Sequence, residues 1–207
     1  MRTKTLLCLA ALTAGVATSM AQSNVYSLNI VGYVTKTNVP GFALIANPLN
    51  ATNNNISALY SDAPALTKII RFVGGAYATS VNDPDFGWSP NALLNPGEGY
   101  FIQVPAGPNY VKTYVGEVVL NSTNNVPTGF SIRASVIPQT GLVQTDLLYP
   151  AVSLDKVIKW TGTAYQTFTL DPDFGWQPSE PTIQVGDSFF AQKTAPANWI
   201  RNFAVGP

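Results

Sequence analysis

One hexapeptide that occurs twice constrains this chain more than any other feature. The letters DPDFGW occupy positions 83–88 and return unchanged at 171–176, 88 residues further along. The two copies are Asp83, Pro84, Asp85, Phe86, Gly87, Trp88 and Asp171, Pro172, Asp173, Phe174, Gly175, Trp176. A string with two aromatic residues does not recur by accident in 207 residues. The repeat therefore predicts one module of about 88 residues that is written twice.

Other residues keep the same spacing on both sides of the hexapeptide. Gly41-Phe42 corresponds to Gly129-Phe130, and the letters KIIRF from Lys68 correspond to KVIKW from Lys156. After a one-residue insertion, Tyr100-Phe101 corresponds to Phe189-Phe190. Aromatic residues replace aromatic residues and basic residues replace basic ones. The correspondence thus extends over most of both copies.

The pattern between these landmarks is that of β-structure. Short runs of β-branched and aromatic residues alternate with Gly, Pro and Asn turns, which is typical of all-β folds. Only Ile56–Tyr60 favours a helical turn. We predict an all-β chain with two tandem copies of a small β-sandwich or barrel-like module, related by a pseudo-twofold internal duplication. The copies span 22–118 and 119–207, and the first holds strands over 25–35, 42–46, 68–73, 76–81, 100–104 and 110–120.

The junction of the copies resembles both ends of the chain. Tyr114–Val118 is similar to Ile30–Val34 near the start and to Phe203–Gly206 at the finish. We expect one middle strand to serve both copies and both outer segments to be paired, because unpaired apolar strand edges promote aggregation. Pairing within one molecule is favoured. Head-to-tail pairing between molecules is the alternative, and it would build chains.

The first 21 residues read as a secretory signal peptide. Arg2 and Lys4 precede a short apolar run over 6–16, and Ala21 ends a small-residue cleavage site before Gln22. No later apolar run in the mature chain reaches the length of a membrane span. The protein is therefore expected to be secreted, at the cell surface or in the periplasm.

The composition excludes several kinds of chemistry. The mature chain would hold no Cys and no His, which removes Ser-His and Cys-His catalysis and the usual zinc ligands. Without Arg2 and Lys4, nine basic residues face 11 acidic ones, a net charge of −2. So weak a charge argues against a nucleic-acid partner. The partner is unknown; self-association and surface glycans are the open alternatives.

The four acids of the hexapeptides are the densest in the chain. Asp83, Asp85, Asp171 and Asp173 could serve a calcium site or paired catalytic carboxylates. The favoured interpretation is structural: the acids accept backbone N–H bonds in a turn, Gly87 supplies a positive φ, and Phe86 and Trp88 anchor the turn in the core. No catalytic residue and no cofactor is predicted, with calcium as the remaining alternative.

Six aromatic residues allow two interpretations. They could form a sugar-stacking platform, or they could pack in the core, which is favoured because their positions recur in the repeat. These residues are Tyr77, Trp88, Trp160, Tyr165, Trp176 and Trp199.

Two strings of the first copy carry a family resemblance. Gly41–Leu49 reads GFALIANPL and Leu94–Ile102 reads LNPGEGYFI. This outline resembles a β-rich repeat of secreted bacterial proteins, "GWNLI…LxPGxGYW", found in exported proteins of the Verrucomicrobia type. The resemblance implies an exported surface or matrix module and no catalytic residues. Phe42 stands where that repeat usually has Trp.

Together these observations predict a non-enzymatic, exported structural protein of the cell surface or extracellular matrix. A carbohydrate-binding module that stacks sugars on Trp and Tyr is the second hypothesis. An Asp-dependent glycoside hydrolase is the third.

Overall fold

The structure is a computed structural model that describes residues 30–203, so the predicted signal peptide lies outside the described residues. Apart from the short helix α2(Ile56–Leu59), the regular elements are strands. Those of the first half are β1(Val31–Asn38), β2(Gly41–Ala46), β3(Lys68–Val73), β4(Ala76–Asp83), β5(Gly87–Ser89), β6(Gly99–Val104) and β7(Tyr110–Glu117). Those of the second half are β8(Asn121–Val126), β9(Gly129–Arg133), β10(Gly141–Leu142), β11(Lys156–Trp160), β12(Tyr165–Asp171), β13(Gly175–Gln177), β14(Thr182–Ile183), β15(Phe189–Lys193) and β16(Ala197–Asn202).

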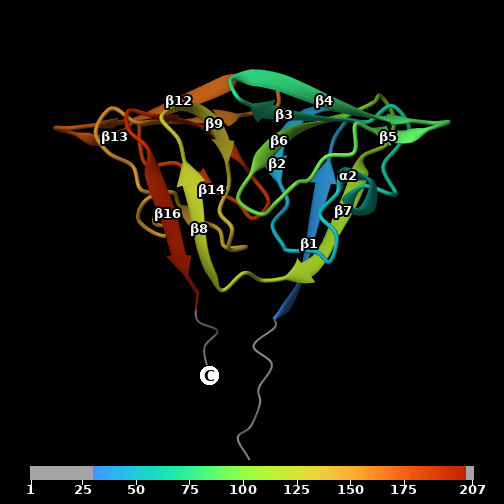
Figure 1. Ribbon diagram of the computed structural model, residues 1–207. Helices are drawn as coiled ribbons and strands as arrows, with labels where there is room; N and C mark the ends of the chain where they lie inside the picture. The colour runs from blue at the N-terminus through green and yellow to red at the C-terminus, as the bar shows by residue number, and fades with distance from the viewer. Residues whose placement is uncertain (1–29, 204–207) are drawn as a thin grey trace, which may run out of the picture.

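Two antiparallel five-stranded sheets dominate the molecule (Figure 1). One has the order β2-β6-β3-β4-β5, and the other has the order β9-β15-β11-β12-β13. Strands that correspond in the sequence repeat take corresponding places in the two sheets. The predicted all-β class is confirmed, whereas the origin of the two halves by duplication stays an interpretation of the sequence.

In the view of Figure 1, a two-stranded ribbon lies below each sheet. β1 pairs with β7 along its whole length, and β8 pairs with β16. The outer segment at the start, Ile30–Val34, is thus paired within the molecule, whereas residues 204–206 of the segment at the finish lie outside the described residues. The expected shared middle strand is wrong, because the chain leaves β7 at Glu117 and starts a new strand at Asn121. Sequence reasoning missed β8 because its letters, NSTNNV, lack the apolar residues that indicate a strand.

Each sheet and its ribbon enclose a separate apolar core. We call the first sheet with β1 and β7 lobe one, and the second sheet with β8 and β16 lobe two. Lobe one is centred on Tyr60, Tyr100 and Tyr114, and lobe two on Phe189 and Trp199; all five side chains are buried. A third cluster of Leu44, Phe101, Ile132 and Phe190 lies between the sheets and joins the lobes.

The lobes meet along a seam of backbone hydrogen bonds. Ala46 N donates to Gly186 O at 3.0 Å, and Ala134 N donates to Gly97 O at 3.0 Å. The edge strands β2 and β9 are therefore covered by the opposite lobe at their ends, which blunts their tendency to pair with other chains. At Gly99 the approach is so close that an added Cβ would lie 2.3 Å from Ile132 Cγ2 and 2.5 Å from Ser188 Cβ.

Gly99→Ala should therefore destabilise the protein by about 2 kcal/mol, the cost of overpacking a tight contact. Thermal unfolding followed by circular dichroism measures this loss. Thr123→Ala, at an exposed position of β8, is the control and should change stability by less than about 0.5 kcal/mol. A Gly99→Ala variant that melts like the wild type would show that the lobes are not joined at this seam.

Candidate functional site

The repeated hexapeptide forms the same turn in both lobes. Asp83 Oδ1 accepts hydrogen bonds from the backbone N–H of Asp85 at 2.9 Å and of Phe86 at 3.1 Å. Asp171 Oδ1 accepts the equivalent bonds from Asp173 at 2.9 Å and Phe174 at 3.0 Å. The glycines that close the turns have φ values of 69° and 71°. The prediction that both hexapeptides share one conformation is confirmed.

The two aromatic residues of each turn differ in burial. Trp88 and Trp176 are each 9% exposed and donate from Nε1, to Tyr60 O and to Gln144 Oε1 respectively. Phe86 is 87% exposed and Phe174 is 80% exposed. Core packing is thus confirmed for the tryptophans, whereas the expectation that Phe86 anchors the turn in the core is wrong. Phe86 lies in the turn between Asp83, the last residue of β4, and Gly87, the first residue of β5, so no neighbouring strand covers its ring.

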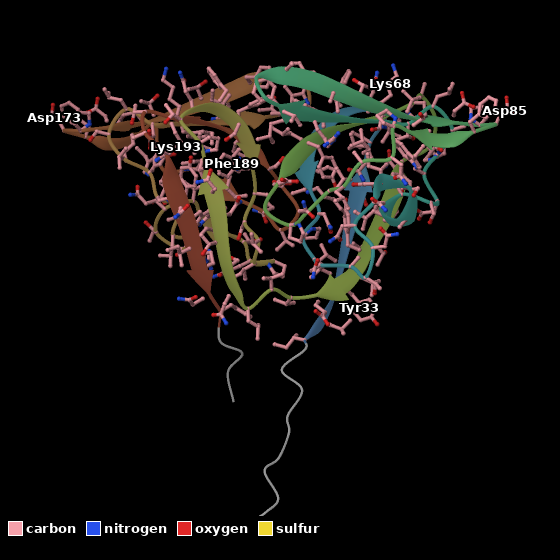
Figure 2. All side chains as sticks on the ribbon, in the orientation of Figure 1. Tyr33, Lys68, Asp85, Asp173, Phe189 and Lys193 are labelled. Carbon is pink, nitrogen blue, oxygen red and sulfur yellow. The ribbon has the colours of Figure 1, made fainter. Side chains whose placement is uncertain are left out.

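The four hexapeptide acids do not converge. Asp85 and Asp173 lie at opposite ends of the molecule (Figure 2). In each turn one of the two carboxylates already accepts two backbone N–H bonds. Among residues 30–203, no group of three acidic, His or Cys side chains is placed to hold a metal ion.

The sheet faces that point away from the ribbons carry two apolar pockets. The first, pocket A, has a volume of about 470 Å³, and the second, pocket B, about 380 Å³. Tyr77 and Tyr165 belong to both. The remaining walls are Phe42, Ile70, Thr79, Phe101 and Trp160 in pocket A, and Phe130, Ile158, Thr167, Phe190 and Phe72 in pocket B. Each pocket takes residues from both lobes, so neither lobe could form one alone.

Strand alternation explains why these side chains share a face. In β3, Ile69 points into the lobe-one core, so its neighbours Ile70 and Phe72 point outward. In β11 the same phase turns Ile158 and Trp160 outward. Ring contacts then join the lobes, because the ring centroids of Phe101 and Phe190 lie 6.0 Å apart in a tilted arrangement. The pockets therefore lie where the two lobes meet.

The tyrosines between the pockets are exposed. Tyr77 is 58% exposed and Tyr165 is 52% exposed, so the expectation that they pack in the core is wrong. Trp160 is half-buried and donates from Nε1 to Phe42 O at 2.9 Å, while Trp199 is buried as expected. Partial burial and the neighbouring Tyr77 phenol raise the pKa of Tyr165, so its hydroxyl stays protonated at neutral pH.

A polar cleft adjoins pocket B through Phe72 and Phe130. It has a volume of about 730 Å³ and is lined in part by Arg71, Glu98 and Arg133. The Arg71 Nε is buried and has no hydrogen-bond partner among the described residues. Burial lowers the pKa of Arg133, and nearby Glu98 opposes that shift. The basic groups of this cleft lie beside the aromatic pocket.

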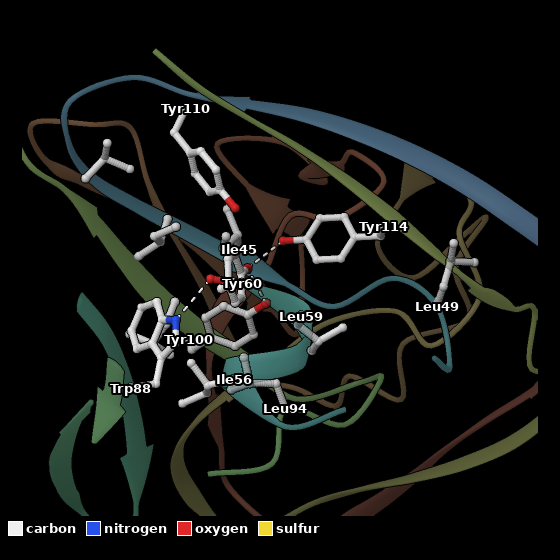
Figure 3. Packing of buried hydrophobic residues seen from close by; sticks show 13 residues of the cluster. Ile45, Leu49, Ile56, Leu59, Tyr60, Trp88, Leu94, Tyr100, Tyr110 and Tyr114 are labelled. Atoms are coloured by element: carbon white, nitrogen blue, oxygen red, sulfur yellow. Dashed lines mark hydrogen bonds between the residues drawn. The ribbon is translucent and has the colours of Figure 1, made fainter. Parts of the chain in front are cut away.

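Polar groups in the lobe cores serve packing. Tyr60 Oη lies 2.7 Å from Tyr100 Oη and 2.6 Å from Tyr114 Oη (Figure 3). Burial raises the pKa of Tyr114 to about 12, so the cluster stays protonated. In lobe two, Asp155 pairs with Lys193 in full burial; burial raises the pKa of Asp155, but hydrogen bonds from Lys193 and the backbone hold it below its ordinary value.

Comparison with known proteins gives no relative. No family model, no curated protein and no solved structure matches the chain. The resemblance to the secreted bacterial repeat therefore stays a prediction. None of the helices within residues 30–203 has the length and apolar character needed to cross a membrane.

The hexapeptide yields a paired prediction. Trp88→Ala should lower the free energy of unfolding by about 3 kcal/mol, because it empties a buried site. At about 2–4 °C per kcal/mol, the melting temperature should fall by about 10 °C. Phe86→Ala in the same turn should stay within about 0.5 kcal/mol of the wild type, since the ring is exposed. Equal losses in the two variants would contradict the opposite burial of these residues.

Calcium provides a second prediction. If the hexapeptide acids only stabilise turns, calcium added at millimolar concentration should leave the melting temperature unchanged, because only ligands of the native state raise it. Differential scanning calorimetry with and without a chelator measures the effect. A rise that Asp83→Ala or Asp171→Ala abolishes would establish a calcium site instead.

Proposed function

We propose that this is an exported, non-enzymatic protein of the cell surface or extracellular matrix that holds a partner through pockets A and B. The partner supplies apolar, ring-sized groups, as protein side chains do. Surface aromatic residues that line a pocket are common anchors of protein interfaces, because they offer large contact areas at low entropic cost.

The observation that carries the proposal is the match between the two pockets. Five of the six pairs of corresponding wall positions hold the same residue type: Phe42/Phe130, Ile70/Ile158, Tyr77/Tyr165, Thr79/Thr167 and Phe101/Phe190. The sixth pairs Phe72 with Trp160, which keeps an aromatic ring. Four of these side chains, Phe42, Phe130, Tyr77 and Tyr165, are exposed, so core packing does not account for their agreement, which favours a shared binding role.

Carbohydrate binding is the second candidate, favoured by the exposed Tyr77 and Tyr165 rings. Sugars need hydrogen bonds to their hydroxyls as well as a stacking surface. Besides the two tyrosine hydroxyls, the polar side chains lining the pockets are Thr79 and Thr167. Walls of this kind suit an apolar group better than a sugar.

A titration with N-acetyl-L-phenylalaninamide tests the proposal. Two-dimensional NMR of the mature protein should show saturable shifts around Tyr77 and Tyr165, with an affinity of about 1 mM for so small a ligand. Thr167→Glu should weaken binding at pocket B, because it places a charge in an apolar wall. Gln166→Glu, exposed on the opposite face of β12, is the matched control and should bind normally.

Two outcomes would count against this function. Absence of any shift at the pockets with the amide would reject the apolar site. Shifts at the same residues with a panel of oligosaccharides, but not with the amide, would establish the carbohydrate candidate in its place.

A further inference from the structure

We infer that the partner is a second copy of this protein, and that its Phe86 or Phe174 ring enters pocket A or pocket B. The inference rests on the proposed function and names the occupant of the same site. It assigns a role to the most exposed large apolar side chains of the described chain, which the fold does not otherwise use.

Both rings are presented on rigid supports. The carboxylate of Asp83 holds the turn around Phe86, and the buried Trp88 anchors the turn from below. The same contacts support Phe174. An apolar side chain on a preorganised turn loses little conformational entropy when it binds, so it is suited to be an interface anchor.

The positions of the turns require an intermolecular contact. The turns lie at opposite ends of the molecule, at β5 and β13 (Figures 1 and 2). The pockets lie between them, because their walls come from both lobes. A ring at either end therefore cannot reach a pocket of its own molecule. A single flat membrane surface is an unsuitable partner, because the two turns project in opposite directions.

The charges of the turns and of the pocket face are complementary. Each ring is flanked by two acids, Asp83 and Asp85 or their counterparts, and none of these acids forms an ion pair within residues 30–203. Lys68 and Lys156 share the outward phase of Ile70 and Ile158 on β3 and β11, and Figure 2 places Lys68 on this upper face. Arg71 and Arg133 line the polar cleft that adjoins pocket B. These bases can receive the acids that accompany the ring.

The internal comparison of the halves supports the same pairing. The hexapeptides are identical in the two lobes, and five of six pocket positions are identical as well. If each ring must fit the pockets, a substitution in the ring or in a pocket wall of one lobe would weaken the contact. Such a contact would keep both the hexapeptides and the pocket walls alike in the two lobes. The contact is head-to-tail, with two rings and two pockets per molecule, so it extends into an open assembly instead of closing into a dimer.

Sedimentation velocity of the mature protein at rising concentration tests the inference. The wild type should show a concentration-dependent increase in mass. Phe86→Ser with Phe174→Ser leaves pockets without rings, and Thr79→Glu with Thr167→Glu leaves rings without usable pockets. Each double variant alone should lose self-association by about tenfold or more, the effect of removing an interface anchor. Mixing the two should restore complexes, because each supplies what the other lacks.

One control variant and one charge variant accompany this experiment. Gln166→Glu should associate like the wild type. Asp85→Asn with Asp173→Asn should weaken association at about 0.05 M salt and match the wild type at about 0.5 M, where charges are screened. The substituted sites are exposed, and circular dichroism of every variant verifies that it folds.

A wild type that stays monomeric at all concentrations, or a ring-less variant that still associates, overturns the inference. If N-acetyl-L-phenylalaninamide nevertheless binds the pockets, the proposed function stands and the partner is another protein. If it does not bind, both proposals fail together.

Discussion

The seam between the lobes is the contact on which the rest of the structure depends. Each sheet would otherwise end in an open edge strand, β2 or β9, with free backbone groups. The seam covers the ends of both edges with backbone hydrogen bonds from the opposite lobe. Gly99 makes this approach possible, because any side chain there would meet Ile132 and Ser188. The corresponding Ser188 instead donates to Ile45 O at 2.9 Å, so one glycine suffices for two lobes.

The seam also creates the face that carries pockets A and B. It sets the two sheets next to each other (Figure 1), so that outward residues of β3 pack against lobe two and those of β11 pack against lobe one. Phe72 of lobe one contacts Phe190 of lobe two, and Trp160 of lobe two contacts Phe101 of lobe one. Pockets with walls from both lobes follow directly. Loss of the seam would therefore remove the pockets even if each lobe kept its own core.

Much of this fold could be predicted from the sequence, since periodicity and turn residues are local signals. The strand runs, the helical turn at Ile56 and the burial of Trp88 and Trp176 all follow from such signals. The exposure of Phe86 could not be predicted in this way, because it depends on where strand pairing stops. The seam was also missed: the Pro-Gly-Glu-Gly string over 96–99 indicates a turn, and nothing local shows that Gly99 meets a strand more than 30 residues away.

The two lobes differ at several buried positions. Corresponding core positions hold Tyr100 and Phe189, or Tyr110 and Trp199, and the tyrosine cluster of lobe one has no counterpart around the Asp155–Lys193 pair. Folding alone tolerates such exchanges when volume and apolar character are kept. The pocket walls, of which Phe101 and Phe190 are buried and the others are partly or largely exposed, have kept the same residue type at five of six positions. Core packing accounts for the agreement at Phe101 and Phe190, but it acts weakly on exposed rings such as Tyr77 and Tyr165. The partner proposed above, which would contact both pockets, would supply a constraint from outside the molecule on these exposed positions.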